Sequence, residues 1–251
     1  MEWEIYLLFF FIAGLYASVG FGGGSSYLAV LALFGVNFLV MRSGALLCNI
    51  VVVTTGTYVF YKNGYLDWRK ALPLTLASVP MAFLGGYLPI KERTFFILLG
   101  STLLLAAILT WWRPKSSPTL DEQAAKDTRS QLFNLSIGGG IGFLSGMVGI
   151  GGGIFLAPVL YLTRWAEAKT IAATASLFIL VNSISGILGQ MAKPDFQIDW
   201  KFTLPLMVSV FLGGQLGSRL GAVKLPAIWV RRATALLIFY IGGQLLLKHL
   251  L

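Results

Sequence analysis

Two glycine clusters are the residues of this sequence whose type and spacing point most directly to binding chemistry. One is Gly20-Phe21-Gly22-Gly23-Gly24 and the other is Gly149-Ile150-Gly151-Gly152-Gly153. Glycine costs about 1 kcal/mol relative to alanine inside a helix and readily takes a positive φ, so each cluster is expected to break a helix. The helix that restarts after the break presents free backbone N–H groups and the positive end of its dipole, which attract an anion.

These positions predict a binding site for a small anion that needs no buried cation. Its expected members are the cluster glycines and the residues that follow the first cluster: Gly22, Gly23, Gly24, Ser25 and Ser26 in one half, and Gly151, Gly152 and Gly153 in the other. The alternative is that the glycines only let helices pack closely. Two clusters of four glycines exceed what packing requires, so the anion site is favoured.

Three neutral polar side chains lie in the apolar runs that follow the clusters. Asn49 and Asn182 match at nearly the same offset as the clusters, and Ser176 precedes Asn182 by one to two helical turns. Such groups donate either to a bound anion or between neighbouring helices. We include all three in the predicted substrate site and leave both roles open.

Several other chemistries are disfavoured by the residues present. All ten Asp and Glu lie outside or at the edges of the apolar runs, so the mid-membrane carboxylate of a cation antiporter or proton relay is missing. The only cysteine is Cys48 and the only histidine is His249, so we expect no catalytic residues, no metal and no cofactor. A dinucleotide loop would need glycine where Ser25 and Ile154 stand.

The elements that position the clusters are expected to be membrane-spanning helices. The chain of 251 residues is 57% apolar and 12% charged, against about 25% charged in soluble domains. The net charge of +9 does not indicate nucleic-acid binding, because the basic residues lie in short gaps between apolar runs. Two uncharged runs, Ile5–Met41 and Ser130–Thr163, are too long for one crossing, so each is expected to form two short helices joined at its glycines.

An internal repeat of about 125 residues relates the two halves. The clusters are 129 residues apart, and Asp67-Trp68 recurs 132 residues later as Asp199-Trp200. With each long run folded back on itself, each half has five segments and the halves are inverted. Thirteen Lys and Arg then share the side of the polar linker, against six on the other side, as the positive-inside rule expects.

The predicted fold is therefore an all-α polytopic membrane protein of about ten helical segments, four of them short, in two inverted repeats. Residues 1–112 form the first transmembrane repeat, 113–131 the cytoplasmic linker and 132–251 the second repeat. We expect a cell (inner) membrane location, with both termini outside. Glycines at intervals of four, in 138–146 and in 213–221, predict close helix packing.

For the charged residues near the expected helix ends, a structural role is the simplest interpretation. The Asp-Trp-basic motifs at Asp67 and Asp199 are typical of helix starts, with the carboxylate as cap. Arg42 and Lys169 flank the helices that follow the clusters, as interface anchors or, alternatively, as an electrostatic entry for an anion.

Taken together, these motifs resemble the TauE/SafE family of membrane transporters, also called the toluene-sulfonate uptake permease family. The resemblance rests on the doubled glycine clusters, Pro158 after the second of them, the run 171–177 (IAATASL) and the doubled Asp-Trp motif. It covers the chain except the linker. It implies transport, often export, of small sulfur-containing anions such as sulfite, sulfoacetate or other organosulfonates.

The resemblance also implies which residues form the site. These are the following positions: Gly22, Gly23, Gly24, Gly151, Gly152, Gly153 and Ser176. The first half departs from the pattern, because Ala29 stands where the second half has Pro158 and Arg42-Ser43-Gly44 replaces the Ala-Thr-Ala-Ser region. The two half-sites are therefore expected to be unequal.

Three alternatives stay open at this point. The substrate could be another small organic or inorganic anion, or the path could be a channel. A membrane assembly factor that transports nothing is the third alternative, and the residues favour it less. The expected partners are a small anionic substrate and the lipid bilayer, and assembly into a homo-oligomer is left open.

Overall fold

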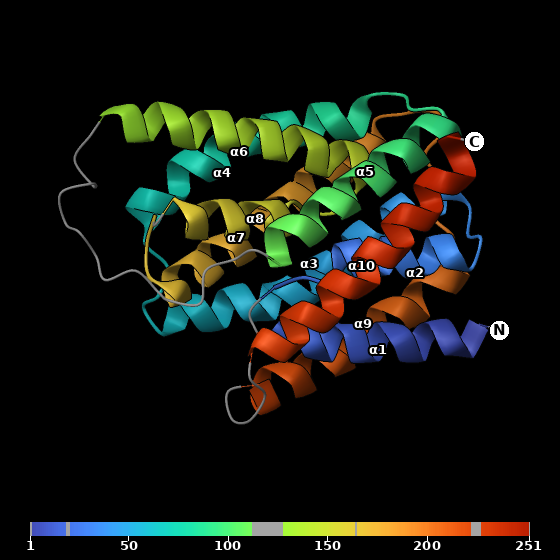
Figure 1. Cartoon of the computed structure of the whole chain (residues 1–251), viewed down its shortest axis with the longest axis horizontal. Coiled ribbons are helices and arrows are strands. Elements are labelled where there is room, and N and C mark those ends of the chain that lie inside the picture. Colours follow the sequence, from blue (N-terminus) through green and yellow to red (C-terminus); the bar gives the residue numbers. More distant parts are fainter. Residues whose placement is uncertain (1, 19–20, 112–127, 164, 222–226, 251) are drawn as a thin grey trace.

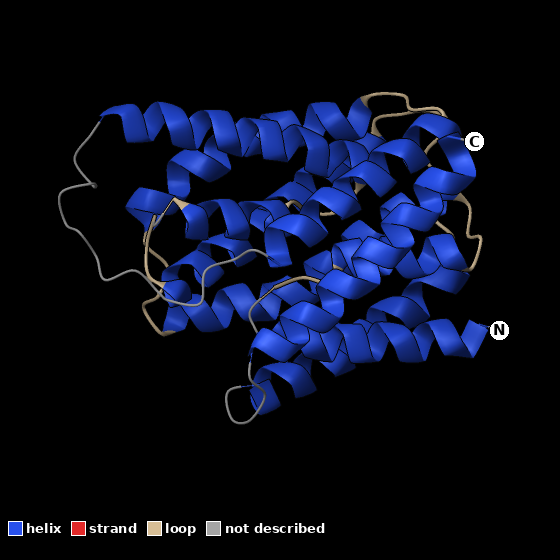
Figure 2. Cartoon of the chain, viewed as in Figure 1, coloured by secondary structure: helices blue, strands red, loops and turns tan. Residues whose placement is uncertain are grey.

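The described residues form a bundle of packed helices (Figures 1 and 2). A computed structural model describes residues 2–18, 21–111, 128–163, 165–221 and 227–250, and no strand occurs in these ranges. The ten helices are α1 (Glu2–Ser18), α2 (Gly24–Leu33), α3 (Phe38–Lys62), α4 (Trp68–Tyr87), α5 (Glu92–Trp111), α6 (Thr128–Val148), α7 (Gly153–Leu162), α8 (Ala168–Met191), α9 (Trp200–Gly221) and α10 (Ala227–Leu250). The all-α fold with ten segments is confirmed.

The two halves, α1–α5 and α6–α10, run in opposite directions. In Figure 1, α1 begins and α10 ends at the same end of the molecule, whereas α6 begins at the other end. We call these the terminal end and the opposite end. The helix contacts follow the same relation, because α4 packs on α6 as α9 packs on α1, and α5 meets α10 as α3 meets α8. The inverted repeat is therefore present in the packing as well as in the sequence.

The glycine clusters interrupt the long apolar runs, as predicted. α1 ends at Ser18 and α2 begins at Gly24, while α6 ends at Val148 and α7 begins at Gly153. Gly20, the first glycine of its cluster, lies outside the described residues. We call residues 21–23 the first break and residues 149–152 the second break.

The prediction of four short helices was wrong in number. Only α2 and α7 are short, with 10 residues each, whereas α1 has 17 and α6 has 21. The reason lies in how the uncharged runs divide. α6 extends back to Thr128, into residues assigned to the linker, and the first run also holds the start of α3. That start is capped by Asn37, whose side chain accepts from the backbone N–H of Leu39 at 2.9 Å. Most of the predicted linker, residues 113–127, lies outside the described residues.

Both Asp-Trp motifs begin helices. Oδ1 of Asp67 accepts from the backbone N–H groups of Arg69 (3.0 Å) and Lys70 (3.3 Å) at the start of α4. Oδ1 of Asp199 accepts from the N–H of Phe202 at 3.2 Å at the start of α9. The predicted capping role is confirmed in both halves.

Regularly spaced glycines hold the helix pairs together. A Cβ on Gly142 of α6 would lie 2.6 Å from the carbonyl oxygen of Ser78 in α4, and a Cβ on Gly146 would overlap the carbonyl of Ala82. In the other half, Gly213 of α9 packs in the same way on the backbone of Phe10 in α1. Only glycine allows backbones to approach this closely, so these positions fix the α4–α6 and α1–α9 pairs.

Within the described ranges, three helical stretches are long and apolar enough to cross a membrane by length and composition: α3, residues 92–109 of α5, and α8. Large apolar side chains also cover the outer faces of other helices, and Phe11, Leu76 and Leu204 are each more than half exposed. A soluble surface rarely carries so many exposed apolar side chains, and contact with lipid explains them.

Candidate functional site

The two glycine breaks meet through Asn49 of α3. Its side-chain Nδ2 donates to the carbonyl oxygen of Ile150, in the second break, at 3.0 Å. A Cβ on Gly24, which follows the first break, would overlap both this amide and the Ile150 carbonyl. Gly24 therefore lets the start of α2 approach the backbone of the other half, and a larger residue would push the breaks apart.

The breaks differ in backbone conformation. In the second break, Gly149, Gly151 and Gly152 have φ of +88°, +84° and +83°, values that L side chains rarely adopt. In the first break, Gly23 has φ of −96°, and neither Gly22 nor Gly24 has a positive φ. Glycine is thus required for backbone conformation in the second break and for close approach in the first.

Both short helices begin without a side-chain cap. Gly23 is the N-cap of α2 and Gly152 is the N-cap of α7, and neither position has a side-chain hydrogen bond. The first backbone bonds of α2 and α7 come from Tyr27 to Gly23 (2.8 Å) and from Phe155 to Gly152 (3.1 Å). The preceding N–H groups have no intrahelical acceptor, and the dipole end adds positive potential, so both starts favour an anion.

The contacts of the glycines show which residues of α3 and α8 are structurally equivalent. A Cβ on Gly22 would meet Asn49, Val53 and Ile179, and one on Gly151 would meet Ile179, Ser183 and Asn49. Asn49 therefore corresponds to Ile179, and Val53 to Ser183, with a common offset of 130 residues.

The sequence match of Asn49 with Asn182 does not hold in the structure. Nδ2 of Asn182 donates to the carbonyl of Phe178 in its own helix at 2.8 Å, and the close neighbours of the glycines include Ile179 and Ser183 instead. Ile179 and Ser183, four residues apart, are the residues of α8 that lie against the glycines, while Asn182 is not among their close neighbours. Its place in the substrate site stays a prediction, with a different environment from that of Asn49.

Unpaired polar atoms surround the meeting point. Oδ1 of Asn49 and Oγ of Ser183 are fully buried and have no hydrogen-bond partner, and Oδ1 of Asn182 shares this property. Ser183 Oγ lies 3.0 Å from the position of a Cβ on Gly151. Buried polar groups are usually paired, so these atoms are available to a ligand or to water.

The predicted serines lie around this centre in different ways. Ser25 and Ser26 are buried in the first turn of α2, and Oγ of Ser26 is 2.9 Å from the hydroxyl of Tyr16 in α1. Ser176 of α8 lies 3.0 Å from Oγ1 of Thr57 in α3 and donates to the carbonyl of Val53 at 3.4 Å. Ser176 therefore links the two long inner helices beside the first break.

A small pocket adjoins the first break on this side. Its lining comprises Ala17, Phe21, Val52, Val53, Thr55, Gly56, Ser176 and Gly214. About 10 Å³ is free for the centre of a water-sized sphere, which is room for about one water molecule. None of the glycines at 22–24 or 151–153 lines it, because Asn49 and Ile179 occupy the space between the breaks. An anion reaches the free N–H groups only if one of these side chains moves.

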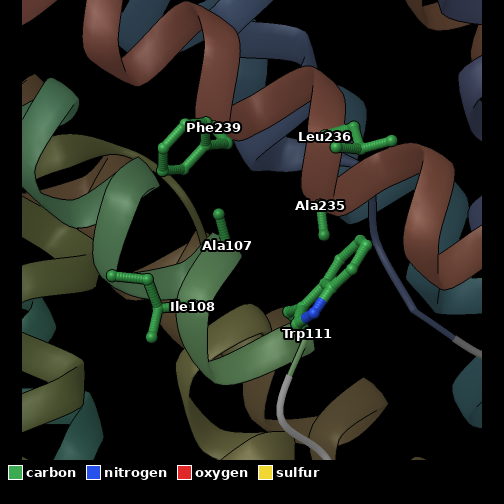
Figure 3. A pocket seen from close by; sticks show the side chains of 6 residues that line it. All are labelled: Ala107, Ile108, Trp111, Ala235, Leu236 and Phe239. Carbon is green, nitrogen blue, oxygen red and sulfur yellow. The ribbon is translucent and has the colours of Figure 1, made fainter.

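A larger pocket lies between α5 and α10 (Figure 3). It measures about 240 Å³ and is lined by Ala107, Ile108, Trp111, Ala235, Leu236 and Phe239. Apolar side chains from both helices face this space, so it does not suit a small anion.

One charged residue is placed where the sequence did not predict it. Arg42, expected as an anchor at the membrane interface, is only 1% exposed. Its Nη2 donates to the carbonyl of Gly146 in the last turn of α6 at 3.4 Å, and its guanidinium lies 5.9 Å from the centre of the Phe95 ring. The interpretation of Arg42 as an interface anchor is therefore wrong, whereas a site that needs no buried cation stays a prediction. One signal was present in the sequence, since Arg42 is the only charge between Ile5 and Tyr61.

Two inverted repeats with discontinuous helices that meet inside the molecule define the class of the protein. Secondary transporters use this architecture, with the substrate near the point where the broken helices meet. The fold and the site therefore indicate a polytopic membrane transporter.

The comparisons with known proteins give the family. Residues 5–245 match the family model described as sulfite exporter TauE/SafE, and the chain belongs to this family of membrane transporters. A probable membrane transporter protein, y4hK of Sinorhizobium fredii, is 34% identical over 244 residues, which cover 96% of each chain. The probable membrane transporter protein YunE of Bacillus subtilis is 24% identical over 78% of each chain. No solved structure gives a significant match.

Proposed function

We propose that this transporter exports a small sulfur-containing oxyanion, such as sulfite, sulfoacetate or another organosulfonate. The description of the matching family names sulfite export, and the helix starts offer the chemistry that such an anion needs. Each sulfonate or sulfite group presents several oxygen acceptors, and backbone N–H groups at a helix start bind such acceptors without a buried positive side chain.

The observation that carries the proposal is the meeting of two uncapped helix starts at one point. α2 and α7 come from opposite halves, begin at Gly24 and Gly153, and approach each other at the bond between Asn49 and Ile150. An anion between them would receive N–H groups and positive dipole ends from both halves. The buried Oγ of Ser183 is a further donor within reach of the second break.

Binding requires a rearrangement of the centre. The Asn49 amide donates to Ile150 in this structure, and Ile179 fills the corresponding place of the other half. We propose that the anion displaces this amide from the carbonyl, so that Nδ2 donates to the anion instead. Rocking of one half against the other then exposes the site to each side of the membrane in turn.

The orientation is part of the proposal. The excess of Lys and Arg on the side of residues 113–131 supports a cytoplasmic position for the opposite end. The terminal end would then face outward from the inner membrane, and export would carry the anion from the opposite end to the terminal end.

Flux from proteoliposomes tests this function. Liposomes with purified protein are loaded with radiolabelled sulfite, sulfoacetate, sulfate or acetate, and efflux is compared with that of liposomes without protein. We expect saturable efflux of sulfite or sulfoacetate. Gly24→Ala should reduce it at least about tenfold, because the new methyl separates the breaks.

Gly140→Ala in α6 is the matched control, since nothing lies within 4 Å of its Cβ position. It should leave flux unchanged. Equal flux from the Gly24→Ala and Gly140→Ala proteins would show that the breaks are not part of the transport site. Efflux of acetate but of no sulfur anion would assign a different substrate class, and no efflux of any anion would favour the assembly-factor alternative.

A further inference from the structure

Arg42 is a buried cation whose bonding capacity is largely unused. Its Nε has no hydrogen-bond partner, and Nη2 makes one long bond of 3.4 Å to the Gly146 carbonyl. No carboxylate in the described part of the chain forms an ion pair with it, although Asp195 attracts it electrostatically. An unpaired charge that is taken out of water is costly. Buried arginines are therefore rare unless a hydrogen-bond acceptor or an anion pairs with the guanidinium.

A second basic side chain, Lys193, interacts electrostatically with Arg42. Lys193 follows α8 and is half-buried in the connection to α9. Burial lowers the pKa of Lys193, the positive charge of Arg42 lowers it further, and Asp195 opposes both effects. Two cations that are close enough to repel each other favour an anion between them.

The connection between α8 and α9 lies against the start of α3. Oγ of Ser43 contacts the carbonyl of Gln197, in that connection, at 3.0 Å. The connection that carries Lys193 therefore packs against the start of α3, which carries Arg42, so the two basic residues come from opposite halves and from segments in contact. This contact is near the terminal end, because Phe95 beside Arg42 lies one turn from the start of α5, where Arg93 Nε donates to the carbonyl of His249 in α10.

Arg42 also adjoins the second break. A Cβ on Gly149 would lie 3.2 Å from the carbonyl oxygen of Arg42 and 3.5 Å from its Cβ. The backbone of Arg42 thus adjoins the second break, while its guanidinium reaches the Gly146 carbonyl and the Phe95 ring. A simpler role is that of a cation at the C-terminal end of α6, where the helix dipole favours it. That role uses one donor of the guanidinium and does not involve Lys193.

We propose that Arg42 and Lys193 form a second anion-binding site, which holds the oxyanion between the meeting point of the breaks and the aqueous phase at the terminal end. Arg42 supplies a planar donor set that suits an oxyanion, and Lys193 supplies a second positive charge. Asp195 competes for the same cations and weakens anion binding. The identity of the anion rests on the function proposed above, whereas the position of the site rests on these residues.

Binding and efflux of radiolabelled sulfite by the full-length protein in nanodiscs and liposomes test this site. Arg42→Gln should weaken sulfite binding at least about tenfold, and Arg42→Lys should weaken it less, by about threefold, because the charge remains although the planar donor set is lost. If Arg42 serves only the end of α6, Arg42→Gln lowers the thermal midpoint without sulfite but leaves the affinity of the folded protein unchanged. That outcome overturns the proposal.

Two surface variants keep the test decisive if Arg42→Gln does not fold. Lys193→Gln should weaken sulfite binding about threefold, and Asp195→Asn should strengthen it about two- to threefold, since the exposed carboxylate no longer competes. Both effects should shrink as the concentration of an inert salt is raised. Unchanged affinity in both variants would contradict the second site.

The Gly24→Ala protein separates failure of this site from failure of the transport function. It should lose efflux but keep a fraction of sulfite binding that disappears in the Gly24→Ala/Arg42→Gln double variant. Wild-type efflux of sulfite together with normal efflux and affinity in Arg42→Gln would overturn only the second site. The absence of any sulfite binding by the wild-type protein would overturn the second site and the proposed substrate together.

Discussion

The first and second breaks occupy equivalent places in the two halves, yet they use glycine for different reasons. The second break holds three glycines with positive φ, so its backbone path depends on them. The first break has ordinary φ at Gly23, and the following Gly24 is required because the Ile150 carbonyl lies where a Cβ would be. The same residue type at matched positions therefore does not imply the same physical requirement.

The side chains at the centre are also unequal between the halves. Asn49 in the first half corresponds to Ile179 in the second, and Ser183 in the second half corresponds to Val53 in the first. Ser176 likewise corresponds to Leu46, since each lies against the glycine that pairs with it, Gly56 or Gly186. The duplicated scaffold thus carries one amide on one side and two hydroxyls on the other, so the centre is chemically unequal.

The two ends of the molecule continue this difference. At the terminal end, Arg42 is buried against the second break and has an unpaired Nε. At the opposite end, Lys169 donates to the hydroxyl of Tyr65 at 2.9 Å and lies 4.6 Å from the centre of its ring, in an exposed position. Among the described residues, the terminal end therefore holds a buried cation with spare donors beside the breaks, and the opposite end holds none.

The largest expected effect comes from removing the chemical difference between Asn49 and Ile179. Asn49→Ile would leave the buried Ile150 carbonyl without its donor, at a cost of about 1–3 kcal/mol, and would leave no side-chain amide for the anion. Transport per folded protein should fall by about 100-fold or more. Ile179→Val is the matched change in the other half, and it should cost about 1 kcal/mol and leave transport within about threefold.

Efflux from proteoliposomes with equal amounts of folded protein measures this comparison. Similar losses in Asn49→Ile and Ile179→Val would mean that the centre works through packing alone. A retained rate in Asn49→Ile would show that the amide is not part of the site.

A second comparison replaces the N-cap glycines of the two short helices. Gly152→Ala forces a side chain into a left-handed conformation, at about 1–2 kcal/mol, and its Cβ would lie 2.8 Å from Cε1 of Phe178. Gly23→Ala has no such backbone cost, and its Cβ meets the ring of Tyr27 at 2.6 Å. Both should impair efflux, but Gly152→Ala should lower the free energy of unfolding more.

Titration of the detergent-solubilised protein with SDS measures the difference in unfolding free energy. Equal losses of stability in the two variants would contradict the assignment of conformational strain to the second break alone.

The sequence predicted the breaks, the inversion and the helix starts, because each depends on local chemistry. Glycine runs interrupt helices, charges mark the ends of apolar runs, and Asp67 and Asp199 cap the residues that follow them. The pairing of Asn49 with Ile179 could not be predicted in this way. Four residues separate α2 from α3 and five separate α7 from α8, so the offset of 129 at the breaks becomes 130 in the following helices.

The burial of Arg42 could not be predicted from the sequence either, because it too depends on contacts between distant segments. Its covering groups are Phe95 on α5 and the backbone of Gly146 on α6, which are distant in sequence. A charge next to apolar runs is typical of an interface anchor, and only the packing of the second half against α3 shows otherwise. Local sequence thus specifies the scaffold, while the unequal centre depends on contacts between halves.

A third comparison concerns a glycine in the helix contact and one outside it. Gly146→Ala should destabilise the protein by about 2 kcal/mol, because its Cβ overlaps the Ala82 carbonyl and the α4–α6 pair must separate. Gly140→Ala on the same helix should instead stabilise by about 0.5–1 kcal/mol, since nothing obstructs its Cβ and helix propensity improves. SDS unfolding measures both, and a destabilising Gly140→Ala would indicate that another surface covers this face.

The smallest expected effect is found where the halves are most alike. Asp67 caps α4 with two backbone bonds and Asp199 caps α9 with one, and both carboxylates lie near the ends of their helices, away from the breaks. Replacement of either by alanine should cost about 1 kcal/mol, the usual loss of an N-cap, and should leave the affinity for the anion unchanged. Parallel SDS unfolding and sulfite-binding measurements on the two variants check both statements. A change of anion affinity in Asp67→Ala alone would show that the two halves differ in their scaffold as well as at the centre. The structural route would be α4, which Asp67 caps and which packs against α6, because the Gly146 carbonyl in the last turn of α6 accepts from Arg42.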